Sequence, residues 1–260
     1  MNGLYSVSIV SVDRPILIEI VGGRYIEEAS GNNVSLVASD GDQLTGVAYY
    51  ISGQPITLSL TYFTHLAVGL TEYLVSTGSN VKTAIDTANT RISNMLGIDI
   101  THTTPLDVTL LSNATSQPTP GHLYGMATAA ISQYMMFISQ VNNSPVHSFY
   151  KSIAFSRMAF NDIRTDGLLN GQGKSGLLSL GTIAVTAETY RHLLATNMFV
   201  IASSLQNRTG VTSADILPTV VALNSADDAV FGGGTPIPLG DTTPQISNVS
   251  ITDGQVAWQT

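Results

Sequence analysis

The side chains best placed for chemistry lie between residues 162 and 173, where acidic and amide groups alternate with glycines. Asp162, Asp166 and Asn170 recur there at intervals of four. Calcium takes six to eight oxygen ligands, and Asp and Asn side chains of a loop can supply several of them. The register of an EF-hand fails, because Arg164 occupies a ligand position and Gly173 stands where the closing Glu belongs. The metal hypothesis is therefore a non-EF calcium site formed by these three residues, and the alternative is a solvated helix end with Asp-Gly turn chemistry.

The same stretch contains Gly-Lys-Ser at residues 173–175, which invites comparison with a phosphate-binding loop. That motif needs four residues between its first glycine and Gly-Lys, so that backbone N–H groups can curl around one phosphate. Gly167 is followed by five residues before Gly173, and no apolar strand precedes it. The spacing argues against nucleotide binding.

Histidines offer little catalytic or metal-binding pattern. The sequence has five histidines: His65, His102, His122, His147 and His192. No two of them have the His-Glu-x-x-His spacing of a zinc hydrolase. Glu188 and His192 are four residues apart on one predicted helix face and could share a metal. Such pairs are more often weak surface contacts.

Carboxylates occur in three close pairs, Glu27–Glu28, Asp40/Asp42 and Asp227–Asp228. A glycosidase needs two carboxyl groups facing each other, about 5 to 9.5 Å apart. Nothing in the sequence places these groups opposite one another, because adjacent strand residues point to opposite faces. A Gly-x-Ser-x-Gly elbow is also missing from the sequence. We therefore expect no enzyme and no cofactor other than calcium.

Composition excludes several classes of protein. The chain has 260 residues, 10 basic and 18 acidic side chains, a net charge of −8 and no cysteine. A nucleic-acid partner is excluded by the lack of positive charge, and disulfides and thiol chemistry by the lack of cysteine. The sequence contains no uninterrupted apolar stretch of about 18 residues, so no membrane span is expected. Only 11% of residues are charged, and the surface must be built from Ser, Thr and Asn.

Periodicity then divides the chain into three parts. Residues 1–60 alternate like strands, with Ile16 to Ile20 as a buried strand, and predict a β-sandwich portion. Residues 61–235 carry apolar positions at spacings of three and four, and predict an all-helical module of about six helices, with Tyr134 to Phe137 in its core. Residues 236–260 read as a linker and the first strands of an Ig-like unit. The expected fold class is thus α+β in several parts. The predicted helices cover 62–76, 80–96, 121–141, 145–163, 186–206 and 213–223.

This order of parts resembles modular exported bacterial proteins. The residues that carry the resemblance are 14–31, RPILIEIVGGRYIEEASG, then 94–101 with Pro105-Leu-Asp, 162–171, and DTTPQIS at 241–247. In such proteins a prealbumin-like or Ig-like β-module precedes a helical module, and Ig-like repeats follow. Related β-modules often hold a Lys–Asn isopeptide crosslink, but residues 1–60 contain no lysine, so that bond is excluded here.

The resemblance implies a non-catalytic module of an adhesin-like protein, outside the cell or at its surface, acting as a spacer or a binding module. Its expected partners are neighbouring Ig-like modules of the same chain and a surface glycan or protein receptor. Three alternatives stay open: a calcium- or glycan-binding module, a hydrolase assembled from scattered carboxylates and histidines, and a filament subunit whose exposed strands pair with other chains.

Overall fold

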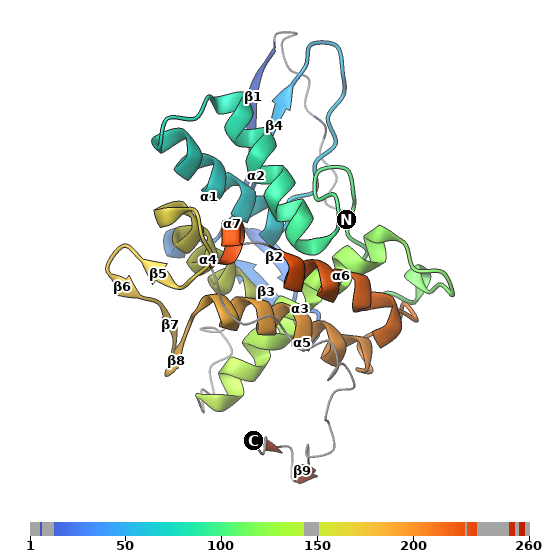
Figure 1. Cartoon of the computed structure of the whole chain (residues 1–260). Helices are drawn as coiled ribbons and strands as arrows, with labels where there is room; N and C mark the ends of the chain where they lie inside the picture. Colours follow the sequence, from blue (N-terminus) through green and yellow to red (C-terminus); the bar gives the residue numbers. More distant parts are fainter. Residues whose placement is uncertain are drawn as a thin grey trace.

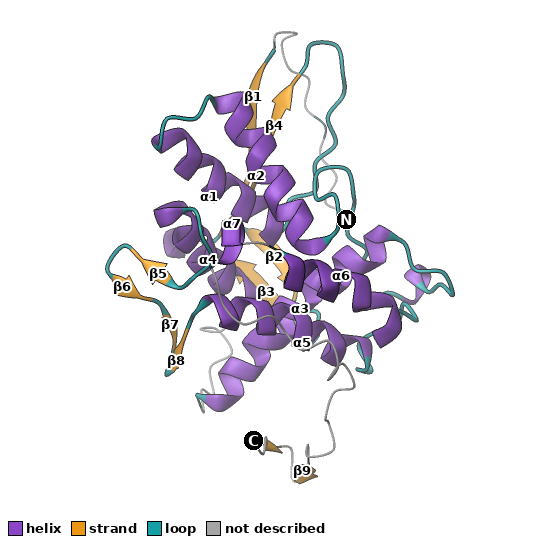
Figure 2. Cartoon of the chain, in the orientation of Figure 1, coloured by secondary structure: helices purple, strands orange, loops and turns teal. Residues whose placement is uncertain are grey.

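The structure, a computed structural model, describes residues 6, 13–142, 151–226, 228–232, 250–252 and 255–257 (Figure 1). Within these residues helices predominate, and the strands are short (Figure 2). The helices are α1 (Tyr62–Ser76), α2 (Val81–Leu96), α3 (Pro120–Val141), α4 (Ser152–Asp166), α5 (Ala187–Ala202), α6 (Ser213–Ser225) and α7 (Asp228–Phe231). The strands are β1 (Arg14–Val21), β2 (Gly23–Ile26), β3 (Asn33–Leu36), β4 (Gln43–Tyr50), β5 (Gln172–Gly173), β6 (Gly176–Leu177), β7 (Ser179–Leu180), β8 (Ile183–Ala184), β9 (Ser250–Thr252) and β10 (Gln255–Ala257).

Local signals set the ends of the helices. Thr61 caps α1, because its hydroxyl accepts the backbone N–H groups of Phe63 and Thr64, and the Thr64 hydroxyl accepts the N–H of Thr61 in return. Gly97 ends α2 in the left-handed conformation, with φ of 65°. Such caps satisfy the N–H and C=O groups that a helix end leaves without partners.

One hydrophobic core joins the helices. α3 packs against α5, and α1 packs against both α2 and α4. Fully buried side chains from all these helices meet in this core, among them Tyr124, Tyr190, Leu70, Ile92 and Ile163. Tyr134 and Met135 are buried with them, while Met136 and Phe137 are partly buried against the same cluster. The run from Tyr134 to Phe137 is therefore core, as predicted.

The predicted β-sandwich is wrong. Among the described residues of this part, from 13 onward, β1 pairs only with β4 and β2 only with β3, so these strands form two separate two-stranded antiparallel sheets. β4 is covered by helices instead of a second sheet, and its Val47 packs with Val68 of α1, Ile85 of α2 and Phe160 of α4. Strand periodicity identifies a buried face but not the element that covers it.

β1 also differs from the buried strand that the sequence suggested. Leu17 is 59% exposed and Val21 51% exposed, although both lie in an apolar run. β4 lies on one side of this strand, and the described residues place no strand on its other side. The filament hypothesis stays a prediction. In such a filament, a strand of another chain would pair with this exposed edge of β1.

The remaining strands are minor. β5 pairs with β6 and β7 with β8, as hairpins between α4 and α5. β9 and β10 pair with each other over three residues, so the residues described there show a two-stranded sheet and no larger Ig-like one. Pro145, the predicted start of the fourth helix, lies outside the described residues, and α4 begins at Ser152. No helix within the described ranges is long and apolar enough to cross a membrane.

Candidate functional site

A pocket of about 360 Å³ opens where the turn after β2 meets a loop and a helix from much later in the sequence. One wall is the end of β2 and the turn after it, with Tyr25 and Glu28. A second is the loop 105–109 between α2 and α3, which includes Asp107. The third is α3, with Gly125 and Thr128. Lys, Arg and His are absent from the described residues that line it, so the two carboxyl groups have no basic partner there.

Glu28 is the enclosed group of this pocket. Its Oε2 atom is buried and has no hydrogen-bond partner among the described residues. Burial, together with the charges of Glu27 and Asp107, raises the pKa of Glu28 to about 8, while the backbone N–H of Glu28 itself opposes part of the rise. A carboxyl group in this state is mostly protonated at neutral pH and can donate a hydrogen bond.

Asp107 is held in place at the pocket by its own loop. Its Oδ1 accepts the backbone N–H of Thr109 at 2.8 Å and the Thr109 hydroxyl at 2.6 Å. The carbonyl oxygen of Asp107 accepts the side-chain amide of Asn113 at 2.8 Å. The Asp107 side chain is exposed, whereas the Glu28 oxygen is enclosed. The loop therefore presents a fixed, solvated carboxylate at the pocket.

Two glycines of α3 let this loop approach the helix. The N–H of Leu106 donates to the carbonyl oxygen of Gly121 at 2.9 Å. A Cβ atom at Gly125 would overlap the carbonyl oxygen of Leu106, and one at Gly121 would lie 2.8 Å from that of Thr104. Only glycine fits where two backbones come this close.

The neighbouring Glu27 serves a different purpose. Its Oε1 accepts the backbone N–H of Ser152 at 2.8 Å, the Ser152 hydroxyl at 2.9 Å and the Tyr25 hydroxyl at 2.6 Å. The Tyr62 hydroxyl meets Ser152 Oγ at 2.5 Å. A carboxylate at the N-terminus of a helix is favoured by the free N–H groups there, so Glu27 caps α4 and fixes the turn that carries Glu28.

The predicted calcium ligands lie together, but two of them belong to a helix. Asp162 and Asp166 are in the last two turns of α4, and Asn170 is in the loop that follows. Asp166 Oδ2 accepts the Asn170 side-chain amide at 2.9 Å, and Asn170 Oδ1 accepts the N–H of Gln172 at 2.8 Å. Asp162 Oδ2 accepts the N–H of Gly171 at 2.8 Å. N–H groups of the protein thus donate hydrogen bonds to the side-chain oxygens of Asp162, Asp166 and Asn170 that would bind calcium. The calcium site stays a prediction.

Asp162 itself is buried beside Tyr190. Burial raises the pKa of Asp162 to about 6, and the N–H of Gly171 and the Tyr190 hydroxyl counteract part of that rise. The Tyr190 hydroxyl is near enough to affect this pKa. By distance and angle, however, neither this hydroxyl nor Asp162 Oδ1 forms a hydrogen bond with a described residue. The residues described here contain no group of three or more His, Cys, Asp or Glu side chains suited to a metal ion.

The histidines do not gather at the pocket. His65 is buried, its Nδ1 lies 2.6 Å from the Thr45 hydroxyl, and its ring stacks on Phe160 at 4.3 Å. His122 closes the cap of α3 with Thr119. His192 lies 3.8 Å from Glu188 on an exposed helix face, the surface contact that was expected. His147 lies outside the described residues.

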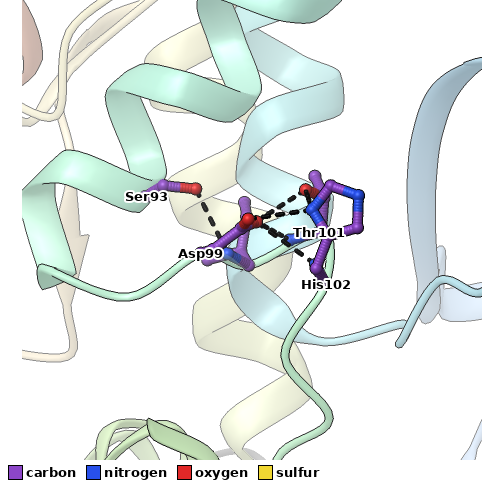
Figure 3. A network of polar contacts seen from close by, with 5 residues as sticks. Ser93, Asp99, Thr101 and His102 are labelled. Atoms are coloured by element: carbon purple, nitrogen blue, oxygen red, sulfur yellow. Dashed lines mark hydrogen bonds and ion pairs between the residues drawn. The ribbon is translucent and has the colours of Figure 1, made fainter.

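His102 belongs to a turn after α2, shown in Figure 3. Asp99 Oδ2 lies 2.8 Å from His102 Nδ1, and Asp99 Oδ1 accepts the N–H groups of Thr101 and His102. Burial opposes ionisation, but hydrogen bonds from Thr101 and His102 outweigh it and lower the pKa of Asp99 to about 2. Ser93 accepts the N–H of Ile100 and lies apart from the His102 ring (Figure 3). The serine and the histidine of this exposed turn do not meet, so they do not form a nucleophile–base pair.

The other carboxylate pairs are also accounted for. Asp42 is buried, accepts the N–H of Val37 at 3.0 Å and lies 3.1 Å from Arg157. Asp40 ends a short 3-10 helix, Ala38–Asp40, with Gly41 at φ of 75°, so this pair lies in the turn that joins β3 to β4, two strands that do not pair with each other. Asp227 and the side chain of Asp228 lie outside what the structure describes.

Sequence reasoning named Glu28 only within a pair and missed Asp107 as a site residue. One local signal was available, since Gly121 and Gly125 on one helix face mark a place where another backbone approaches closely.

Comparison of this chain with models of protein families, with curated proteins and with solved structures gave no match.

Proposed function

We propose that this chain is a non-catalytic binding module of an adhesin-like bacterial protein, outside the cell or at its surface, and that the pocket at Glu28 and Asp107 is its ligand site. One observation carries the proposal: the carboxyl-bearing residues Glu28 and Asp107 line one pocket, and no basic side chain is among its described lining residues. Carboxyl groups without a basic partner can accept hydrogen bonds from a ligand that carries N–H or O–H donors.

The construction of the site supports this proposal. Glu27 anchors one wall to α4, and hydrogen bonds and close backbone packing anchor the loop of Asp107 to α3. A site whose walls are fixed before the ligand arrives loses less conformational entropy on binding. The surface of Ser, Thr and Asn supports the extracellular address. Neighbouring modules of the parent chain, and a glycan or protein receptor, are the partners that we propose.

A thermal-shift panel tests the proposal with calcium, EDTA, methyl glycosides, small amines and matched alcohols. A ligand at one hundred times its Kd adds about 2.7 kcal/mol to the free energy of unfolding. We expect at least one organic probe to raise Tm in the wild type but not in Glu28→Gln. A rise with calcium that EDTA reverses and that Asp162→Asn removes would assign the binding to the other site. A panel without any shift would contradict a binding function.

A hydrolase is a second candidate, because two carboxyl groups now line one pocket and the pKa of Glu28 is raised. Glu28 would be the general acid and Asp107 the base or nucleophile, the roles that carboxyl pairs fill in glycosidases. Nitrophenyl glycosides distinguish the two functions. Turnover that disappears in both Glu28→Gln and Asp107→Asn would replace the binding proposal with an enzymatic one.

A further inference from the structure

The balance of charge at the pocket identifies the kind of ligand. Glu28 and Asp107 both line it, Glu27 lies close enough to Glu28 to raise its pKa, and no basic side chain is among the described lining residues. The whole chain carries a net charge of −8. Such a field repels anions and attracts cations toward the pocket.

The remaining lining suits an organic cation better than a bare metal ion. Calcium would need six to eight oxygens, and the described residues gather no set of three metal-ligating side chains. Ile26, Pro105 and Leu106 supply apolar walls, and Tyr25 supplies an aromatic ring. An aromatic face attracts a cation, and apolar walls cover an alkyl chain. A charged amine on a short carbon chain matches both parts of the lining.

We propose that the ligand of this pocket carries an ammonium group, which donates hydrogen bonds to the carboxyl groups of Glu28 and Asp107 while its carbon chain lies against Ile26 and Leu106. The inference rests on the proposed function, because it names the ligand class of the same site. An ammonium group provides three N–H donors, enough for the carboxyl groups of both Glu28 and Asp107, which line the pocket. A charge-assisted pair of this kind is stronger than a neutral hydrogen bond.

Proton release distinguishes this ligand from a neutral one. With a pKa of about 8, Glu28 holds a proton at pH 7, and an ammonium group beside it favours the ionised form. Binding therefore sends the proton of Glu28 to the buffer. The other titratable groups near Glu28 are Glu27, Asp107, Tyr25 on β2 and Tyr62 on α1. The pKa values of both tyrosines are raised well above neutrality, so neither supplies this proton.

Isothermal titration calorimetry tests the inference with n-butylamine, 1,4-diaminobutane and, as the matched neutral probe, 1-butanol. Each titration is repeated in buffers with different ionisation enthalpies, which gives the number of protons released. We expect the amines to bind at least about ten-fold more tightly than the alcohol, and to release close to one proton at pH 7 and almost none at pH 9.5. Glu28→Gln should weaken amine binding and abolish the release, and Glu188→Gln on an exposed face should change neither.

The outcomes separate this inference from the proposed function. Equal binding of amine and alcohol, or amine binding without proton release, would overturn the ammonium ligand. A methyl glycoside that binds in the wild type but not in Glu28→Gln would also overturn it, while the binding function stands. No binding by any of these probes, together with an unchanged thermal-shift panel, would overturn both.

Discussion

Glu28 and Asp107 come from loops that are far apart in the sequence, yet they line one pocket, and the charge of Asp107 contributes to the raised pKa of Glu28. Glu28 is enclosed and Asp107 is solvated. Burial raises the pKa of Glu28 to about 8, so this carboxyl group is mostly protonated at neutral pH. The pocket therefore places a protonated carboxyl group beside an exposed one.

The first prediction concerns stability against pH. The ordinary pKa of Glu28 is 4.5, and in the folded protein it is about 8. Between these values the folded protein holds a proton that the unfolded chain has lost, so the free energy of unfolding falls as pH rises from 4.5 to 8. The difference between wild type and Glu28→Gln should fall over this range by about 1.4 kcal/mol for each unit of real pKa shift. Urea unfolding at several pH values measures it, and a constant difference would contradict the raised pKa.

The second prediction concerns the close approach of α3 and the loop of Asp107. Gly125→Ala forces a methyl group into the carbonyl oxygen of Leu106, so the loop must move away and the pocket must change shape. We expect a loss of about 1–3 kcal/mol of stability, the usual cost of overpacking, and a loss of ligand binding. Gln140→Ala, at an exposed position of the same helix, should stay within about 0.5 kcal/mol. A stable Gly125→Ala protein that binds normally would show that this contact does not shape the pocket.

The third prediction concerns the cap on α4. Glu27→Gln removes the negative charge that accepts the N–H of Ser152 and the hydroxyl of Tyr25. Hydrogen bonds to a charged group contribute about 1.5–3 kcal/mol, so Tm should drop by several degrees. Glu72→Gln is the matched control, because that carboxylate is exposed in its pair with Arg164 and such pairs contribute little. Equal melting of both variants would remove Glu27 as an anchor of the site.

The fourth prediction concerns acid. Burial lowers the pKa of His65 from its ordinary 6.5 to about 4. Between these values the unfolded chain binds a proton that the folded protein does not, so the free energy of unfolding falls as pH drops from 6.5 to 4. His65→Gln should lose this acid dependence, although it also loses the stacking on Phe160. His192→Gln on the exposed face should keep it, and an identical acid slope in all three proteins would contradict the assignment.

Helices could be predicted from the sequence far better than the relations between strands. The apolar spacing is local, and it gave the bounds of α1 as 62–76, those of the structure. The β-sandwich was wrong because a strand face does not specify what covers it: Val47 meets helices α1, α2 and α4. The pocket depends on contacts between distant segments, such as Glu27 with Ser152, which no window of sequence contains.

The most direct test of the binding site is an NMR titration that follows the side-chain carboxyl carbon of Glu28 with saturating 1,4-diaminobutane and, separately, with a methyl glycoside and calcium. In the free protein this carbon should titrate near pH 8. We predict that the amine shifts its resonance to that of an ionised carboxylate at pH 7, together with the backbone signals of Asp107 and Thr128. If no probe changes any of these signals at saturating concentration, the pocket is not a ligand site, and the function that we propose is wrong.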